Sequence, residues 1–150
     1  YALHNQLPNV KGTVLWYAKA AVDNVGNYGS MLRNVYWKYP ALQPSMPFID
    51  GKAPKKVKRM KVLNIDGDMV LFWTAPSGKS WKDMATKYVV YRFEKGQKTD
   101  ISNPMNIITI TSDTYLKLPY QDGTKEYTYA VTALDRMQNE SKAVKKKVKL

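Results

Sequence analysis

Side chains that commonly carry enzyme chemistry are scarce in this sequence. It contains no cysteine and one histidine, His4, which stands close to the first residue. These counts exclude cysteine nucleophiles, thiolate metal sites, histidine-based metal clusters and a Ser/His/Asp triad within the chain. A metal site would need oxygen ligands throughout, and we expect neither a metal nor a cofactor.

Two short motifs resemble ion and phosphate sites without completing them. DGD at 66–68 lacks the remaining ligand positions and the closing glutamate of a calcium-binding loop, and a hairpin turn explains it better. SGKS at 77–80 lacks the first glycine of a phosphate-binding loop and the strand-to-helix context that such a loop needs. Neither motif therefore predicts a binding site.

Lysine dominates the charge of the chain. Lys and Arg number 24 against 12 Asp and Glu, a net charge of +12, with clusters at 55–61 and 145–149. Such a charge favours anionic partners through a field that does not depend on sequence. Arginine is scarce, whereas proteins that read nucleic acids rely on arginine for bidentate contacts, so the composition disfavours nucleic acid as the partner.

The ends and the hydropathy of the chain bear on its location. No stretch of about 18 uninterrupted apolar residues exists, so we expect no transmembrane segment. The chain begins at Tyr1, without a methionine and without the charged-then-apolar pattern of a signal peptide. We interpret it as a piece of a longer product, in which an export signal would have been lost with the missing part.

A proline-rich segment at 39–54 divides the chain. It holds four of the eight prolines. Each proline fixes its own φ, withholds a backbone donor and pushes the preceding residue toward extended geometry. We therefore predict a semi-rigid connector at 39–54, between a first part, 1–50, and a second part, 55–150.

The first part reads as one strand followed by one helix. GTVLWYAKA at 12–20 is apolar and β-branched, as in a buried strand. In the segment 30–39, Ser30 is placed to act as N-cap, apolar residues recur at helical spacing, and Pro40 ends the run. One strand and one helix cannot enclose a core, so we interpret 1–50 as the last unit of a larger α/β domain.

The second part reads as strand and turn throughout. Its apolar runs stand at 56–65, 69–76, 87–97, 106–120, 127–134 and 143–150, and the fourth of them has room for two strands. About seven strands at this spacing predict an antiparallel β-sandwich. The last run, AVKKKVKL, fits an edge strand, where lysines discourage association between sheets.

Three of these runs resemble the fibronectin type III domain. MVLFWTAP supplies Trp73 where that family has a core tryptophan, YVVYR follows, and YTYAVTALDRMQNES at 127–141 matches the sixth strand of the family. The resemblance implies that Trp73, Tyr127 and Val131 lie in the core, with Tyr127 at the tyrosine-corner position. The chain departs from the family in the turn DRMQNES, which lacks the family's common glycine.

A second resemblance covers nearly the whole chain. The segments that carry this resemblance are GTVLWYAKA, then YGSMLRNVYWKYPALQPSMPFID, and directly after them the sandwich. The order of these segments resembles the C-terminal region of the bacterial glycosyl-hydrolase-like family ten of Bacteroides-type organisms. Those proteins have a (β/α)8 barrel followed by a fibronectin-like domain. The resemblance implies that 12–20 is the last barrel strand, that 30–39 is the last barrel helix, and that the protein is exported to the periplasm or cell surface.

Glycoside hydrolysis ordinarily uses two carboxyl groups, and the resemblance implies that both lie upstream, so we assign no catalytic residue here. Asp23 follows the last barrel strand on the face where barrel active sites are built, although an Asx-type turn is the simpler explanation. Trp16, Tyr17 and Lys19 lie near the end of that strand. With Asp23 they are candidates for a sugar contact in the intact protein, core packing being the alternative for the two aromatic rings.

Two functions follow. In the first, the chain is the noncatalytic C-terminal fragment of a glycoside hydrolase, and the sandwich packs on the upstream barrel or spaces it from the cell surface. Carbohydrate is then a partner of the intact protein. In the second, the sandwich is an independent module that binds an anionic polymer, an acidic glycan or a nucleic acid, through its lysines. Without the barrel, the apolar stripe of 30–39 would pack on the sandwich or on a second copy of the chain.

Overall fold

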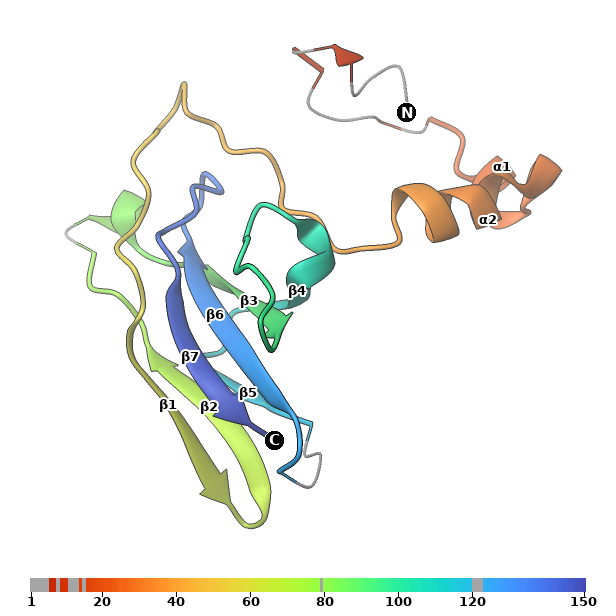
Figure 1. Ribbon diagram of the computed structural model, residues 1–150. Helices are drawn as coiled ribbons and strands as arrows, with labels where there is room; N and C mark the ends of the chain where they lie inside the picture. The colour runs from red at the N-terminus through yellow and green to blue at the C-terminus, as the bar shows by residue number, and fades with distance from the viewer. Residues whose placement is uncertain (1–5, 8, 11–13, 15, 79, 120–122) are drawn as a thin grey trace. The chain divides into compact units, whose positions relative to one another are not determined.

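The computed structural model describes residues 6–7, 9–10, 14, 16–78, 80–119 and 123–150. The chain forms two compact units, Tyr1–Pro44 and Ser45–Leu150, whose elements are drawn in Figure 1. The boundary falls inside the proline-rich segment, so the residues from Ser45 onward belong with the sandwich. None of the helices in the described ranges is long and apolar enough to cross a membrane.

Seven strands form two antiparallel sheets in the second unit. They are β1 (Lys58–Ile65), β2 (Asp68–Thr74), β3 (Lys87–Glu94), β4 (Ile107–Thr111), β5 (Tyr115–Lys117), β6 (Glu126–Leu134) and β7 (Val144–Lys149), with the 3-10 turns η4 (Trp81–Asp83) and η5 (Pro104–Asn106) between strands. One sheet has the order β1-β2-β5 and the other β4-β3-β6-β7. This is the strand order of a fibronectin type III domain, so the predicted fibronectin-like sandwich is confirmed.

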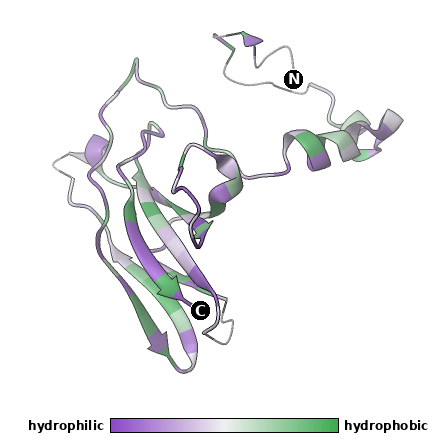
Figure 2. Ribbon diagram, viewed as in Figure 1, coloured by the Kyte–Doolittle hydropathy of each residue, from purple (hydrophilic) through white to green (hydrophobic). Residues whose placement is uncertain are grey.

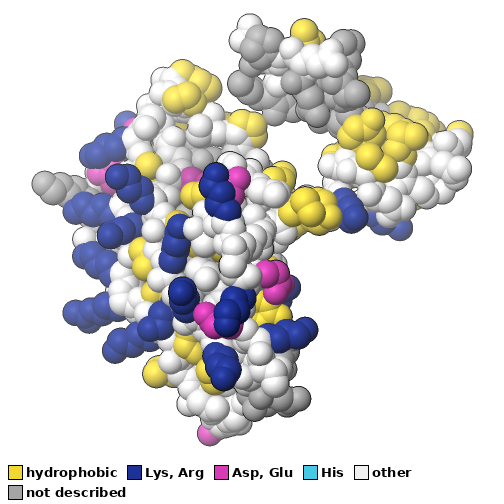
Figure 3. All heavy atoms as spheres, in the orientation of Figure 1, with side chains coloured by type: hydrophobic (Ala, Val, Ile, Leu, Met, Phe, Trp, Pro, Cys, Tyr) yellow, Lys and Arg dark blue, Asp and Glu magenta, His cyan; other side chains and the backbone are white. Residues whose placement is uncertain are grey.

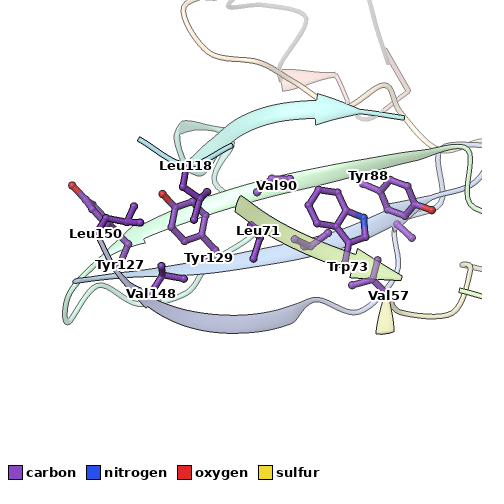
Figure 4. Packing of buried hydrophobic residues seen from close by; sticks show 12 residues of the cluster. Val57, Leu71, Trp73, Tyr88, Val90, Leu118, Tyr127, Tyr129, Val148 and Leu150 are labelled. Carbon is purple, nitrogen blue, oxygen red and sulfur yellow. The ribbon is translucent and has the colours of Figure 1, made fainter. Parts of the chain in front are cut away.

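The core lies between the two sheets and is rich in aromatic residues (Figure 4). Trp73 of β2 and Tyr88 of β3 meet edge to face with ring centroids 5.6 Å apart, and both side chains are buried. Tyr127 and Val131 of β6 belong to the same buried cluster. The residues assigned to the core from the sequence lie in it because alternate residues of each strand face the opposite sheet.

The outward face of the larger sheet is buried as well. Tyr91 and Phe93 of β3 stack with ring centroids 6.4 Å apart, and both are fully buried. On the neighbouring strand β6, Ala130 and Thr132 point to the same outward face and are also fully buried. The strand β6 is therefore covered on both faces, unlike a strand with one face in solvent.

A long connection lies over this outward face. The segment 95–106 links β3 to β4 and ends in η5. Within it, Gln97 Nε2 donates a hydrogen bond to Asn106 Oδ1 over 3.0 Å. Lys145 of the edge strand β7 donates to the hydroxyl of Thr99. The segment therefore reaches across β6 to β7, although the two strands that it connects are adjacent on the other side of the sheet.

The DGD motif forms the turn between β1 and β2. Ile65 pairs with Asp68, which leaves Asp66 and Gly67 as a two-residue loop, and both loop residues have positive φ, 51° and 89°. The side chain of Asn64 accepts a hydrogen bond from the backbone N–H of Gly67 over 3.0 Å. A two-residue loop with positive φ at both positions matches the twist of the flanking strands, so the motif serves a hairpin.

The first unit is helical over much of its described length. Its elements are α1 (Lys19–Val22), the 3-10 turn η2 (Val25–Asn27), α2 (Tyr28–Met31) and a π-helical turn, η3 (Leu32–Tyr36). Residues 12, 13 and 15 of the predicted strand 12–20 lie outside the described residues. Lys19 and Ala20, at its end, are helical, so the strand prediction is wrong there. The sequence AKAAV holds three alanines, and alanine is the strongest helix former.

The predicted helix 30–39 begins and ends earlier than expected. Its first helical residue is Tyr28 and its last is Tyr36. Ser30 therefore lies inside the helix and does not cap it. The backbone N–H of Ser30 instead donates to the side-chain oxygen of Asn24 over 2.8 Å, so the polar residue that satisfies this part of the helix stands in the preceding loop.

Candidate functional site

The predicted sugar-contact residues lie at the surface of the first unit. Trp16 is 98% exposed and Tyr17 is 67% exposed, so neither ring is packed in a core. Lys19 in α1 and Asp23 at its C-terminal end form an exposed ion pair. The exposure leaves both rings available to a sugar or to another protein surface.

Ligands for a metal ion do not gather in the part of the chain that the structure describes. No group of three or more His, Cys, Asp or Glu side chains there is arranged to hold an ion. His4 lies outside the described residues. Two carboxylates of the second unit, Asp135 and Glu140, are instead engaged by hydrogen-bond donors of the protein itself.

Asp135 fastens the chain that enters the sandwich to the turn after β6. Its buried carboxylate accepts hydrogen bonds from the backbone N–H groups of Met137 and Asn139, over 2.8 and 2.9 Å, and from Asn139 Nδ2 over 2.9 Å. Asn139 Nδ2 also donates to the carbonyl of Asp50 over 2.8 Å. The N–H of Met46 donates to the carbonyl of Met137 over 3.0 Å. The turn DRMQNES thus fixes the course of the incoming chain.

Apolar side chains at this attachment remain exposed. Met46, Phe48 and Ile49 of the incoming chain are 44%, 83% and 53% exposed. Trp81 in η4 is 56% exposed, and the guanidinium carbon of Arg136, in the turn DRMQNES, stands 5.2 Å from its ring centroid. We call these five residues the entry surface. Exposed apolar groups gathered beside a chain junction are typical of a surface that another protein part covers.

Glu140 receives two hydroxyl donors on the outward face of the larger sheet. Tyr91 Oη and Thr132 Oγ1 each donate to Glu140 Oε1 over 2.6 Å. Burial raises the pKa of Tyr91, and the Glu140 carboxylate beside it raises that pKa further. A tyrosine held protonated in this way is a hydrogen-bond donor and a structural anchor, and it is poorly suited to act as a general base.

The first unit contains an apolar hollow of about 460 Å³. It is lined by Ala18, Ala21, Val22, Gly29, Leu32, Arg33 and Trp37. Gly29 lets α2 pass close to α1, because a Cβ at this position would stand 2.1 Å from the carbonyl oxygen of Ala21. The lining suits an apolar side chain better than a charged ligand.

A hollow of about 500 Å³ lies on the sandwich between the segment 95–106 and the strands β6 and β7. We call it the lysine hollow, and its lining residues are Gly96, Gln97, Thr99, Thr128, Lys145, Lys146 and Lys147. Most of the β7 ribbon is hydrophilic in Figure 2. Among the charged side chains on the face drawn in Figure 3, lysine and arginine are more frequent than carboxylates. Among the lining residues that the structure describes there is no carboxylate, so the hollow favours an anion.

The second unit thus has two features that the sequence did not predict, the entry surface and the lysine hollow. The lysines 145–149 were visible as a cluster. The opposite wall of the lysine hollow could not be predicted from the sequence, because Thr99 and Lys145 stand 46 positions apart. The turn DRMQNES stands out in the sequence only as a departure from a family pattern. Its two Asx-type residues, Asp135 and Asn139, were the signal that the turn builds its own hydrogen-bond network.

Comparison with curated proteins finds a relative along nearly the whole chain. It is 38% identical over 150 residues to a protein named glycosyl hydrolase YngK from Bacillus subtilis (strain 168). The match covers 98% of this chain and 28% of that protein, so the chain spans about a quarter of the length of its relative. No family model matches the chain.

Comparison with solved structures finds chains of low sequence identity that match about two thirds of this chain. An FN3tt mutant is 19% identical, with 63% of this chain and 93% of that chain covered and a TM-score of 0.46. The spore cortex lytic enzyme SleM of Clostridium perfringens is 13% identical, with 65% and 28% covered and a TM-score of 0.45. The Endo-D glycoside hydrolase domain of Streptococcus pneumoniae R6 is 16% identical, with 67% and 16% covered and a TM-score of 0.46.

Proposed function

We propose that this chain is the noncatalytic C-terminal part of a bacterial glycosyl hydrolase, with the sandwich as an accessory domain. The observation that carries the proposal is the 38% identity, over 98% of the chain, to a protein that bears the name glycosyl hydrolase. Because the chain spans 28% of that relative, the catalytic barrel would lie in the remainder. Membership of family ten and export to the cell envelope belong to the same proposal.

Two of the described carboxylates, Asp135 and Glu140, are engaged within the fold, which supports a noncatalytic role. Asp135 is buried and saturated by donors from its own turn. Glu140 accepts two hydroxyl groups that are buried with the sheet. A glycosidase needs one carboxyl group as acid and a second as base or nucleophile, both reachable by substrate. These two carboxylates are occupied in holding the fold together.

The entry surface supports a role in which the sandwich packs against the barrel. Met46 and Ile49 stand at or beside the positions where the incoming chain is hydrogen-bonded to DRMQNES, and a domain that precedes them in the chain could cover their exposed side chains. In the same proposal, Trp16 and Tyr17 with their neighbours Lys19 and Asp23 contact sugar at the rim of the intact barrel. A second copy of the chain is the alternative cover for the helix Tyr28–Tyr36.

Hydrolysis assays test the noncatalytic role. The purified chain is incubated with a panel of neutral and acidic polysaccharides, and new reducing ends are measured against a buffer blank. We expect no hydrolysis of any substrate. Release of reducing ends that persists after a second purification step would sink the proposal, because the chain would then carry its own catalytic pair.

The size of the native product tests the missing barrel. An antibody raised against this chain captures the polypeptide from the source organism, and mass spectrometry gives its intact mass. We expect a product larger than the 17.2 kDa of the chain by roughly 250 residues or more, the size of a (β/α)8 barrel. A native product of the same mass as the chain would leave no room for a barrel and would overturn the proposal.

A further inference from the structure

The lysine hollow combines concentrated positive charge with neutral hydrogen-bond donors. Lys145, Lys146 and Lys147 line it together with the hydroxyl of Thr128. In the register of the sheet Thr128 pairs with Lys147, so the two side chains stand side by side on neighbouring strands. A hollow of about 500 Å³ lies within the range of small-ligand sites.

The charge of these lysines is not neutralised by the protein around them. Within the described ranges, none of the ion pairs involves Lys145, Lys146 or Lys147. The neighbouring Lys95, by contrast, is paired with Glu126 over 3.1 Å. Lys145 and Lys147 pair with Ala130 and Thr128 on the outward face of the sheet, so their positive charge faces the hollow, whereas Lys146 pairs with the core residue Tyr129 and its side chain lies on the other face. An anion in the hollow would gain attraction without first displacing a carboxylate.

Protection of a sheet edge accounts for only part of this arrangement. β7 is an edge strand, and lysines on an edge discourage association with another sheet. Edge protection needs no opposite wall. Here the segment 95–106 crosses β6, and its Thr99 is bonded to Lys145, which turns a lysine-bearing edge into a hollow. A wall of this kind is expected of a binding site, since it limits the directions from which a ligand can be contacted.

We propose that the lysine hollow binds anionic groups of an acidic polysaccharide. Lysine is a compact point charge suited to single carboxylate groups, and Thr128 offers a hydroxyl that can bond sugar hydroxyls. None of the described residues of the lining is aromatic or an arginine, the residues on which nucleic-acid bases stack. The choice of a polysaccharide rests on the proposed function, whereas the preference for an anion rests on the hollow alone.

Titration calorimetry at low ionic strength tests the site with polygalacturonate and with its fully methyl-esterified form. The ester keeps the sugar backbone and removes its charge. We expect binding to polygalacturonate, a steep loss of that binding as salt rises, and no binding to the ester. Absence of binding to polygalacturonate at low salt overturns the proposal.

Two double variants with the same change in net charge locate the site. One carries Lys145→Gln and Lys147→Gln, and its control carries Lys55→Gln and Lys56→Gln in the exposed cluster before β1. We expect roughly tenfold weaker binding from the first double variant and less than about twofold from the control. Equal losses of affinity in both variants would mean that the polymer is attracted by the overall positive charge of the protein, and would overturn the hollow as the binding site. Thermal unfolding checks that each variant is folded.

Thr128→Val tests whether the lining of the hollow contributes to binding independently of charge. It removes one lining hydroxyl at unchanged net charge, and we expect a several-fold loss of affinity for polygalacturonate. Unchanged affinity in this variant contradicts the proposed lining. A single-stranded oligonucleotide that binds more tightly than polygalacturonate would overturn the choice of polymer. None of these outcomes bears on the intact mass or the hydrolysis assay, so the two proposals fail separately.

Discussion

The two units of this chain differ in how much of themselves they bury. Among the described residues of Tyr1–Pro44, Leu32 is the only buried side chain, while Ser45–Leu150 holds every other buried residue. The first unit exposes large apolar groups, including Val22 at 80% and Trp37 at 57%. A segment with so little buried apolar surface cannot offset the entropy of ordering its own chain.

The two units draw their stability from different sources. The sandwich has an internal core and a second buried layer on the outside of its larger sheet, so its fold is self-contained. The first unit has an apolar hollow and exposed rings instead. Its structure is the kind expected for an element that completes its core against another domain, which agrees with the proposed barrel upstream.

The largest expected effect on stability comes from substituting a core tryptophan, and an exposed tryptophan of the other unit serves as its control. Trp73 is 4% exposed in the sandwich core, whereas Trp16 is 98% exposed in the first unit. We expect Trp73→Ala to lower the free energy of unfolding by about 3–5 kcal/mol. Trp16→Ala should change it by less than about 0.5 kcal/mol. Chemical denaturation of both variants measures the contrast, and a comparable loss in Trp16→Ala would show that the first unit shares the core of the second.

Local patterns explain why the sandwich could be predicted from sequence. Most strands are short runs rich in apolar, β-branched and aromatic residues, and turn residues such as DGD separate them. The core positions Trp73 and Val131 followed from the family resemblance. The helices of the first unit were harder, because GTVLWYAKA carries strand-forming residues beside the helix-forming AKAAV, and local propensities conflict there.

Contacts between distant positions explain what could not be predicted. The bond from Asn139 to the carbonyl of Asp50 joins residues 89 positions apart. It turns part of a proline-rich segment, predicted as a connector, into a piece of the sandwich. The lysine hollow has the same origin, because its wall and its lysines come from separate segments. No periodicity within either segment reports on the other, so only the folded chain reveals the site.

The next effect concerns the network that holds the incoming chain. Asn139→Ala removes the donor shared by Asp135 and the Asp50 carbonyl and leaves the buried Asp135 oxygen without that bond. We expect a loss of about 2 kcal/mol in the free energy of unfolding, and faster hydrogen exchange at the amide of Met46.

Asn24→Ala is the matched control for this network in the first unit. Asn24 also bonds a backbone group through its side chain, the N–H of Ser30, but at an exposed site. This variant should leave the unfolding transition of the sandwich unchanged. Slow exchange at Met46 in Asn139→Ala would contradict the role given to the network.

A smaller effect depends on pH. The folded state holds the pKa of Tyr91 above the ordinary value of about 10, through burial and the Glu140 carboxylate, and burial also raises the pKa of Tyr88 and Tyr129. The unfolded chain therefore loses these protons first as pH rises. The stability that they contribute is complete below pH 10 and declines above it.

Tyr91→Phe tests this linkage. At pH 7 the loss of the hydroxyl bond to Glu140 should lower the free energy of unfolding by about 1.5 kcal/mol. Between pH 10 and 11 the decline should be shallower than in the wild type, by up to about 1.4 kcal/mol per pH unit for one tyrosine. Parallel pH profiles of the two proteins, measured by denaturation, would show that Tyr91 ionises in both states alike.

The smallest effect lies in the turn that lacks the family's common glycine. Gln138 adopts the left-handed conformation there, with φ of 62°. Gln138→Gly would relieve about 1 kcal/mol of backbone strain but would add about 0.5–1 kcal/mol of entropy to the unfolded chain, so we expect a net change within about 0.5 kcal/mol. A stabilisation above about 1 kcal/mol by chemical denaturation would mean that strain dominates. A net change near zero would mean that the hydrogen bonds to Asp135 fix the shape of this turn whichever residue stands at position 138. The sequence can then lack the family's common glycine here and keep its fold.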